Sequence, residues 1–146
     1  MLRINRQTDY AVRVLLALAR REEGARLTST QIRREMIIPE AFLSRIVAQL
    51  AQAGLVQTFA GRDGGLQLRR PAEQISLRDV VEIFEGPLML SECMAGEDNC
   101  PFEDNCMVQP RWAGLQAVIL KELSKTTFFD LAKEANKQYS TTSAGK

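Results

Sequence analysis

Hydrophobic positions in the first half of the 146-residue chain recur with the spacing of one helix face, in three stretches separated by turn residues. The first stretch predicts a helix over residues 8–21. The second predicts a short helix over residues 29–36, because Thr28 and Gln31 match a capping box, in which each side chain hydrogen-bonds the other residue's backbone N–H. The third opens at Pro39, which suits the first position of a helix because it has no N–H to satisfy. Its apolar stripe comprises Phe42, Leu43, Ile46, Val47 and Leu50.

A pair of strand-like segments follows the third helix directly. Residues 55–59 and 66–68 alternate apolar and polar positions, and the glycine-rich segment 61–65 between them predicts a hairpin turn. Two short helices, a turn and a hairpin occur in this order in a winged helix-turn-helix. We therefore predict a mainly helical fold in which residues 1–71 form a winged helix-turn-helix DNA-binding region.

The second half of the chain has a different pattern. Residues 72–107 are expected to hold a linking helix, opened by a capping pair of Ser76 and Asp79, followed by a stretch without clear periodicity from residue 88. Irregular stretches that long are rare in compact domains unless they serve a function. Residues 108–137 are expected to form a long helix and a closing helix, with 138–146 as a flexible polar tail.

The long helix, predicted over residues 108–123, is apolar on more than one side. A helix that lies only on the surface of its own domain needs a single apolar stripe. We therefore expect this helix to form a subunit interface, so that the protein is a homodimer. The alternative is a helix that packs only within its own chain.

One side of the third helix carries polar and small residues, opposite its apolar stripe. In a helix-turn-helix that side enters the major groove, where an arginine can bond the O6 and N7 atoms of guanine together. The preceding helix would cross the phosphate backbone, and the wing tip would reach a neighbouring minor groove. The candidate DNA-binding residues are Thr28, Ser29, Arg33 and Arg34 before the turn, Ala41, Ser44, Arg45, Ala48, Gln49 and Gln52 on the third helix, and Arg62 on the wing.

Charge is divided unevenly along the chain. Residues 1–71 contain twelve arginines, no lysine and six acidic residues, whereas residues 72–146 contain seven basic and twelve acidic residues. The total is a net charge of +1, which hides a basic first half and an acidic second half. Phosphate contact by the basic half explains this division, and an accidental bias of two solvated faces is the alternative.

Three cysteines, Cys93, Cys100 and Cys106, all lie in the irregular acidic stretch. An odd number argues against a disulfide framework, and the stretch offers little apolar surface in which a thiol would be buried. Thiolates that bind a metal would explain an ordered loop here. The intervals of six and five residues exceed those of structural zinc sites, which favours an iron–sulfur cluster. A thiol redox switch, or three thiols without a metal, remain alternatives.

Several functions are excluded by residue types that the chain lacks. It has no histidine, no glycine-rich phosphate loop and no nucleophile elbow, so we expect no enzyme activity. No run of about 18 apolar residues occurs, so we expect no membrane span. The opening residues lack the apolar core of a secretory signal, so we expect a cytoplasmic protein.

Taken together, the motifs resemble the Rrf2 family of bacterial regulators along residues 1–135. The resemblance rests on Thr8-Asp9-Tyr10-Ala11, Leu50 with Gly54-Leu55-Val56, Gly61 with Gly64-Gly65, Ile75-Ser76-Leu77 with Asp79-Val80-Val81, the three-cysteine loop, Trp112, and Thr127 with Asp130-Leu131. It implies a dimeric winged-helix transcription factor whose long helix crosses its partner. It also implies that the three cysteines hold the cluster. In some members the fourth ligand is an N-terminal aspartate of the other subunit, and Asp9 matches that position here. Other members use a histidine three residues after the last cysteine, but this chain has Gln109 at that position.

The expected function is a DNA-binding transcriptional regulator, a repressor, whose binding to a double-stranded operator is controlled by an iron–sulfur cluster that senses nitric oxide, redox state or iron status. Three cysteines with an aspartate and no histidine favour a 4Fe–4S over a 2Fe–2S cluster. The alternative function is a redox-switch or protein-interaction module that uses the thiols without a cluster.

Overall fold

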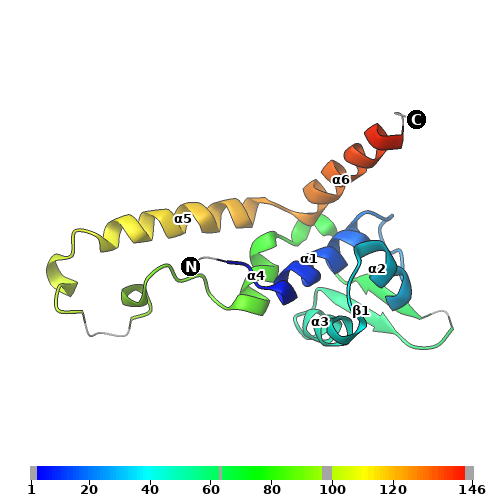
Figure 1. The fold of residues 1–146 in the computed structure, drawn as a ribbon, viewed down its shortest axis with the longest axis horizontal. Coiled ribbons are helices and arrows are strands. Elements are labelled where there is room, and N and C mark those ends of the chain that lie inside the picture. The colour runs from blue at the N-terminus through cyan, green and yellow to red at the C-terminus, as the bar shows by residue number, and fades with distance from the viewer. Residues whose placement is uncertain (1–2, 63, 97–99, 144–146) are drawn as a thin grey trace.

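The computed structural model describes residues 3–62, 64–96 and 100–143. These residues form six α-helices and one antiparallel pair of strands, which agrees with the predicted mainly helical winged-helix fold (Figure 1). The elements are α1 Arg6–Ala19, α2 Ser29–Met36, α3 Glu40–Gln52, β1 Val56–Phe59, β2 Gly65–Leu68, α4 Leu77–Glu85, α5 Gln109–Lys125 and α6 Phe128–Ser143.

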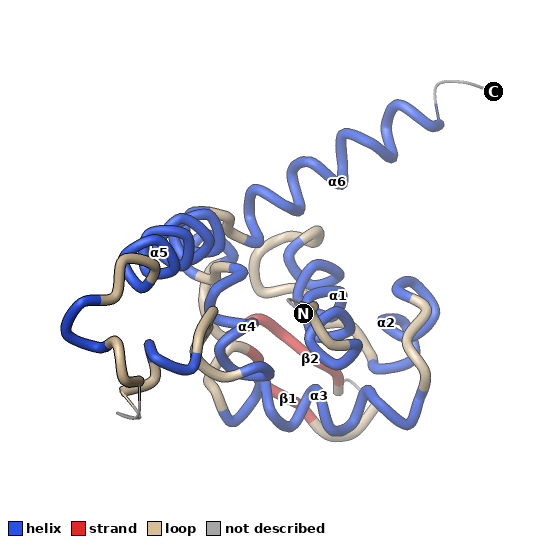
Figure 2. Tube along the Cα trace, turned by 60° about the vertical axis from the view of Figure 1, so that its left-hand side comes forward, coloured by secondary structure: helices blue, strands red, loops and turns tan. Residues whose placement is uncertain are grey.

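Most of the chain packs around α1, which contacts α2, α3, α4, β2 and α6 (Figure 2). The α1 residues Ala11, Val14 and Leu15 are wholly buried because they repeat on one helix face. The same core includes Ile75 before α4 and Phe128 at the start of α6. We call the part built on this core, residues 6–85 with the first half of α6, the body. Its core therefore extends beyond the winged helix-turn-helix itself.

Local signals set the ends of the helix-turn-helix. The Thr28 hydroxyl accepts a hydrogen bond from the Gln31 N–H at 3.1 Å, and the Gln31 side chain accepts one from the Thr28 N–H at 2.8 Å, so the predicted capping box is present. The prediction that Pro39 is the first helical residue is wrong. Pro39 is the N-cap, with an extended ψ of 140°, because the chain must turn there between two helix directions.

The wing is broader than a hairpin. Val56 pairs with Leu68 and Phe59 with Gly65 in the antiparallel β1–β2 ladder. On its other side β2 pairs with Leu27, through backbone hydrogen bonds of 3.0 and 2.7 Å between Leu27 and Leu66. Gly65 has a φ of 144°, and a Cβ there would lie 2.6 Å from the Leu27 carbonyl oxygen. Only glycine therefore allows the chain before α2 to join the wing.

The ends of α4 and α6 are clamped together. Ser76 caps α4 as predicted, its hydroxyl accepting from the Asp79 N–H at 3.3 Å. Beside this cap, the Leu77 N–H donates to the Thr126 carbonyl and the Phe128 N–H donates to the Ile75 carbonyl, both at 2.9 Å. These bonds hold the corner between α5 and α6 against the body, and the Phe128 ring is buried below them.

Residues 86–96 and 100–125, the arm, project from the body on the side opposite the wing tip (Figure 1). The arm consists of the cysteine loop, with 3₁₀ turns over Glu92–Met94 and Glu103–Asn105, and of α5. None of the α5 residues is buried. No helix in the described ranges has the length and apolar character needed to cross a lipid bilayer.

The predicted end of the last helix at residue 137 is wrong, because α6 continues to Ser143, and the remaining tail residues 144–146 lie outside the described residues. Two contacts from Arg20, the residue that caps the end of α1, favour this extension: its guanidinium lies 4.4 Å from the Tyr139 ring centroid, and its Nε donates to the Asn136 side chain at 3.2 Å. The hydroxyls of Thr141 and Thr142 also donate to carbonyls four residues earlier. A polar composition alone did not reveal these contacts.

Candidate nucleic-acid interface and cysteine loop

Helix α3 has one buried and one exposed side. Leu43, Ile46 and Leu50 are buried against α1 and β1. On the other side, the candidate residues Ala41, Ser44, Arg45, Ala48 and Gln52 are all exposed, whereas Gln49 is half-buried at the flank. The predicted division of the helix into two faces is therefore present, with small residues that permit close approach on both sides of Arg45.

The candidate residues at the start of α2 are exposed, and those near its end differ in exposure. Thr28 and Ser29 are exposed, although the Thr28 hydroxyl already accepts the capping bond. Arg34 is exposed. Arg33 is half-buried, lies 3.5 Å from a carboxylate oxygen of Glu40, and has a buried Nε without a hydrogen-bond partner in the described part of the chain. Arg34 is thus better placed than Arg33 for a phosphate.

The turn between α2 and α3 is braced by α1. The Arg13 guanidinium donates to the Met36 carbonyl at 3.2 Å, at the end of α2. Tyr10 packs its ring edge-on against Phe42 of α3, with centroids 5.3 Å apart. These contacts fix how the two helices of the helix-turn-helix lie relative to the body.

Asp9, the candidate fourth ligand, lies in the first turn of α1 and is paired with Arg13 at 2.8 Å. Its neighbour Thr8 is wholly buried and donates its hydroxyl to Glu85 at 2.6 Å. Glu85 also accepts the Asn5 N–H at 2.8 Å. The start of α1 is therefore tied to the end of α4, where the chain enters the cysteine loop. Sequence reasoning missed this link because the partners are about eighty residues apart.

The wing carries one predicted and one unpredicted basic residue. Arg62 is exposed at the tip, as expected. Arg26 was not singled out, yet its guanidinium lies 3.5 Å from the centroid of the Phe59 ring on β1. The pairing of Leu27 with β2 brings Arg26 across the wing, and no local sequence signal marks that pairing.

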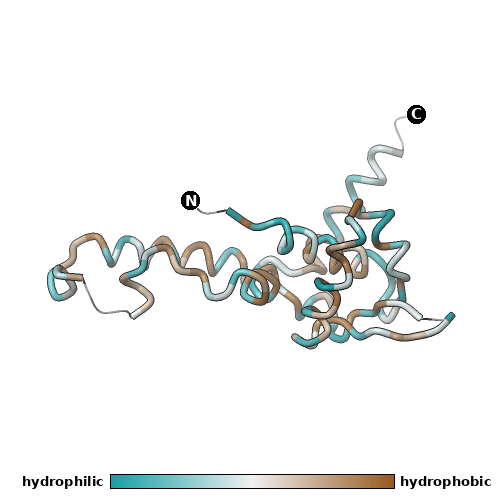
Figure 3. Tube along the Cα trace, turned by 60° about the horizontal axis from the view of Figure 1, so that its bottom comes forward, coloured by the Kyte–Doolittle hydropathy of each residue, from teal (hydrophilic) through white to brown (hydrophobic). Residues whose placement is uncertain are grey.

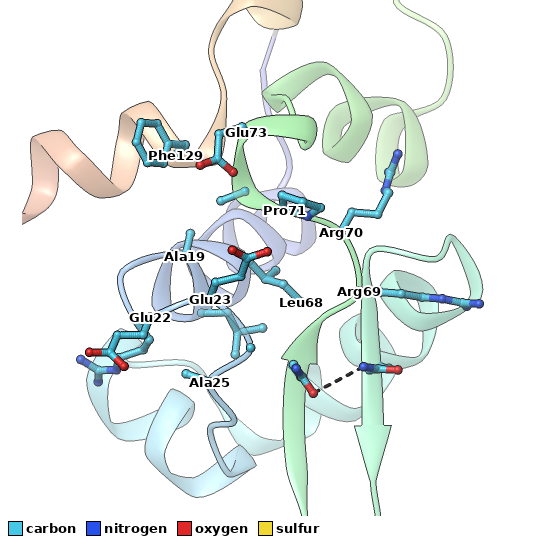
Figure 4. A pocket seen from close by; sticks show the side chains of 16 residues that line it. Ala19, Glu22, Glu23, Ala25, Leu68, Arg69, Arg70, Pro71, Glu73 and Phe129 are labelled. Atoms are coloured by element: carbon cyan, nitrogen blue, oxygen red, sulfur yellow. Dashed lines mark hydrogen bonds between the residues drawn. The ribbon is translucent and has the colours of Figure 1, made fainter.

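A hollow of about 380 Å³ lies between the end of α1, the wing and the start of α6. Figure 4 shows Glu22, Glu23 and Glu73 around it, with Phe129 on one side, while Arg69 and Arg70 extend away from the glutamates. Gln57 and Gln67 join across the two strands at 3.4 Å beside it. The hollow is separate from the exposed side of α3 and mixes both charge signs.

The cysteine loop folds back along α5. The Leu90 N–H donates to the Gln116 side chain of α5 at 3.1 Å, and the turn over Glu92–Met94 contacts the same helix. Cys93 lies with its Sγ 3.1 Å from the Ser91 hydroxyl. The Cys106 Sγ accepts the Gln109 N–H at 3.3 Å, at the N-terminus of α5.

The three cysteines are not gathered into a closed site. Cys93 and Cys106 are half-buried and Cys100 is exposed. Within residues 3–62, 64–96 and 100–143, no three His, Cys, Asp or Glu side chains lie close enough together to hold one metal ion. The chemistry of three thiols in one loop still fits an iron–sulfur cluster, since small metal sites commonly close only as the metal orders them.

Exposed apolar side chains line α5. Trp112 is 44% exposed, Leu115 46% and Val118 59%. In Figure 3 brown, hydrophobic stretches follow α5 out along the arm, away from the body. A contiguous apolar face of this kind is typical of a protein interface, because a monomer in water gains nothing by exposing it.

A winged helix-turn-helix with an exposed recognition face defines the class of DNA-binding transcriptional regulators. Residues 4–134 match the model of the Rrf2 family, described as an iron-dependent transcriptional regulator. The chain belongs to this family, as its motifs indicated. The family is described as one of transcriptional regulators, and relatives such as NsrR and CymR are named as regulators, which agrees with the expectation of a regulator and not an enzyme.

Two curated relatives illustrate the similarity. Protein aau3 of Rhizobium meliloti (strain 1021) is 40% identical over 132 residues, which cover 89% of this chain and 79% of the relative. The HTH-type transcriptional regulator NsrR of Bacillus licheniformis is 31% identical over 123 residues, covering 84% and 82%.

Solved structures share the fold. CymR, the global cysteine regulator of B. subtilis, superposes with a TM-score of 0.73 at 25% identity and covers 92% of this chain and 98% of its own. IscR of T. potens gives a TM-score of 0.71 at 24% identity, covering 92% and 88%, and supports the fold alone.

Proposed function

We propose that this transcriptional regulator is a homodimer that binds a double-stranded operator through α3, α2 and the wing. The observation that carries the DNA-binding part is the exposed side of α3, where Ala41, Ser44, Arg45, Ala48 and Gln52 lie opposite a buried stripe. Arg45 is flanked by small residues, so the helix can approach base edges closely enough for a bidentate contact with guanine.

The other candidate residues have positioning roles in this proposal. Arg34, with Thr28, Ser29 and Arg33, contacts phosphates beside the groove, and Arg62 enters a neighbouring minor groove. Gln49, at the flank of α3, contacts the groove edge. The concentration of arginine in residues 1–71 supplies the positive potential that such contacts need.

We further propose that Cys93, Cys100 and Cys106 hold an iron–sulfur cluster, of the 4Fe–4S type, and that Asp9 of the partner subunit is its fourth ligand. The support is the family's description as iron-dependent, the similarity to NsrR, and three thiols in one acidic loop. A bound cluster supplies reactivity toward oxidants and nitric oxide, so its presence reports on redox state or iron status. The protein's operator binding, as a repressor, then depends on whether the loop is ordered.

The dimer in this proposal forms through α5. This helix has no buried residue and exposes Trp112, Leu115 and Val118. A second copy that covers these side chains would give α5 the apolar contacts that the single chain does not provide.

The proposal is tested by purifying the protein without oxygen and measuring its visible absorbance, iron and sulfide. We expect a brown protein with about four iron atoms per chain. The variant with all three cysteines changed to serine should be colourless and should contain no stoichiometric iron. Binding of an operator duplex should change when the cluster is removed from wild type and should not change in the variant. A colourless wild-type protein with full operator affinity contradicts the cluster proposal.

Asp9→Ala tests the fourth ligand, and Glu82→Ala is its matched control. Glu82 forms the same kind of exposed ion pair one helical turn from its partner, with Arg78 at 2.7 Å. We expect Asp9→Ala to shift the absorbance and shorten the lifetime of the cluster in air, and Glu82→Ala to leave both unchanged. Equal spectra and lifetimes in wild type and Asp9→Ala remove Asp9 from the ligand set.

A thiol switch without a cluster is the second candidate function. The separated thiols favour it, and so does the similarity to CymR structures, of which one from Staphylococcus aureus is of an oxidized form. In that case the anaerobic protein is colourless, and a mild oxidant changes operator affinity while one pair of thiols disappears from a thiol titration.

A further inference from the structure

The turn between α2 and α3 contains an isoleucine in a strained backbone conformation. Ile37 has φ 54° and ψ 54°, the left-handed region. All other residues with positive φ in the described part of the chain are glycines. A β-branched side chain is disfavoured there because its Cβ crowds the following carbonyl, and glycine is the usual residue at such a helix end.

The surrounding contacts explain why the strain persists. The Ile38 N–H donates to the Arg33 carbonyl at 3.1 Å, and Ile38 is buried in the core. One residue earlier, the Met36 carbonyl accepts from Arg13. The backbone on both sides of Ile37 is therefore held, and residue 37 must take the left-handed conformation whatever its side chain.

The side chain gains little within the chain in return. Ile37 is 80% exposed, so most of its apolar surface stays in contact with water. A single exposed isoleucine is unremarkable, and a single strained residue can be stabilised by burial. Ile37 has both a strained backbone and an exposed apolar side chain, and a glycine at this position would have neither. Such a position indicates that the side chain acts on something outside the free chain.

Its place in the fold identifies that partner. Ile37 lies in the turn three residues before α3, with Arg34 before it in the chain and Ala41 after it. Figure 2 shows the labelled helices α2 and α3 that this turn joins. Both neighbours belong to the proposed DNA interface and both are exposed. A duplex offers an apolar side chain two kinds of carbon surface, the thymine C5-methyl group and the deoxyribose.

We propose that Ile37 is a DNA-contacting residue that packs against apolar carbon of the operator beside the groove entered by α3. This inference rests on the proposed DNA binding. An apolar contact neutralises no phosphate, so it adds affinity without adding to the salt dependence of binding, unlike a contact by Arg34. The strained isoleucine thus lowers the stability of the free protein and raises the affinity of the complex.

The test uses full-length protein and the duplex that wild type enriches from a library of randomised duplexes. Ile37→Gly should raise the thermal midpoint by about 3 °C, because the strain is relieved. It should also weaken duplex binding about fivefold with an unchanged slope of log affinity against log salt. Ile37→Leu, which keeps the apolar side chain, should retain the affinity. Arg45→Ala serves as the reference for loss of a base contact.

Thymine-to-uracil substitutions, made one at a time, identify the contacted carbon. If one uracil weakens wild type but not Ile37→Gly, the contact is to that methyl group. If no uracil separates the two proteins while Ile37→Gly stays weaker, the contact is to deoxyribose.

Equal binding of wild type and Ile37→Gly, with Arg45→Ala weakened, overturns the role of Ile37 and leaves the proposed function standing. A lower thermal midpoint for Ile37→Gly also overturns it, since the side chain would then stabilise the free chain. If wild type enriches no duplex, the DNA-binding proposal fails first and this inference fails with it.

Discussion

The body and the arm are stabilised in opposite ways. In the body, α1 is surrounded by α2, α3, α4 and α6, and its inner face is wholly buried. In the arm, the described residues of the cysteine loop form two short 3₁₀ turns, and α5 has no buried residue. The body is also rich in arginine, whereas residues 86–107 contain five acidic residues and no basic residue.

This difference shows which part of the molecule buries its apolar side chains within one chain and which part leaves them exposed. The body buries a core of apolar residues within one chain, so this core needs no second copy to be removed from water. The arm leaves apolar side chains on α5 exposed and its thiols apart. In the proposed function it becomes fully ordered only when it binds a cluster and a second copy, so it can report whether the cluster is present.

Two adjacent phenylalanines give the largest expected contrast. Phe128 is wholly buried in the body and Phe129 is 43% exposed beside it. Phe128→Ala should lower the free energy of unfolding by about 3–5 kcal/mol, because it leaves a cavity in the core. Phe129→Ala should lower it by less than about 1 kcal/mol. Chemical denaturation of both variants measures the difference, and similar losses would show that the core does not reach α6.

A charged substitution on α5 tests whether a second copy of the chain covers its exposed apolar side chains. Val118→Asp should weaken dimerisation by about 2 kcal/mol or more, since a carboxylate would be buried in the interface. Ala113→Asp, about 140° around the same helix, is the control and should have a smaller effect. Sedimentation equilibrium measures both. A monomeric wild type, or equal dimerisation of all three proteins, contradicts an α5 interface.

Two arginines test whether α3 contacts bases while α2 contacts phosphates. Arg45→Ala should cost about 1–3 kcal/mol of binding to the selected duplex and relax the preference at one base pair. Arg34→Ala should weaken selected and random duplexes alike and lower the salt slope by about one. Competition assays at several salt concentrations separate the two effects. Identical behaviour of the two variants would show that α3 does not read bases.

The smallest effect is expected at the α2 cap. Thr28→Ala removes the hydroxyl that accepts the Gln31 N–H and should destabilise the body by about 1 kcal/mol. Ser29→Ala, at the next residue, removes a hydroxyl with no capping role and should change the stability by less than about 0.5 kcal/mol. Thermal unfolding compares them. A larger loss for Ser29→Ala would show that the cap does not stabilise α2.

Much of the body could be predicted because its signals are local. The capping residues Thr28 and Ser76, the stripe on α3 and the glycines of the wing act within a few positions of the chain. The exposed side of α3 followed from the same stripe. Predictions failed where a distant contact decided the outcome, as for the extension of α6 beyond residue 137, which Arg20 supports through Asn136 and Tyr139.

By itself the sequence determined the order of helices and strands, the two faces of α3, the separation of basic from acidic segments, and the presence of three thiols in one loop. Only the tertiary structure decided that Leu27 joins the wing, that Thr8 hydrogen-bonds Glu85, and that the conformation of Ile37 is strained. The physical reason is the distance along the chain over which each effect acts. Periodicity and capping act between neighbours in the chain, whereas strain and burial depend on which distant segments meet.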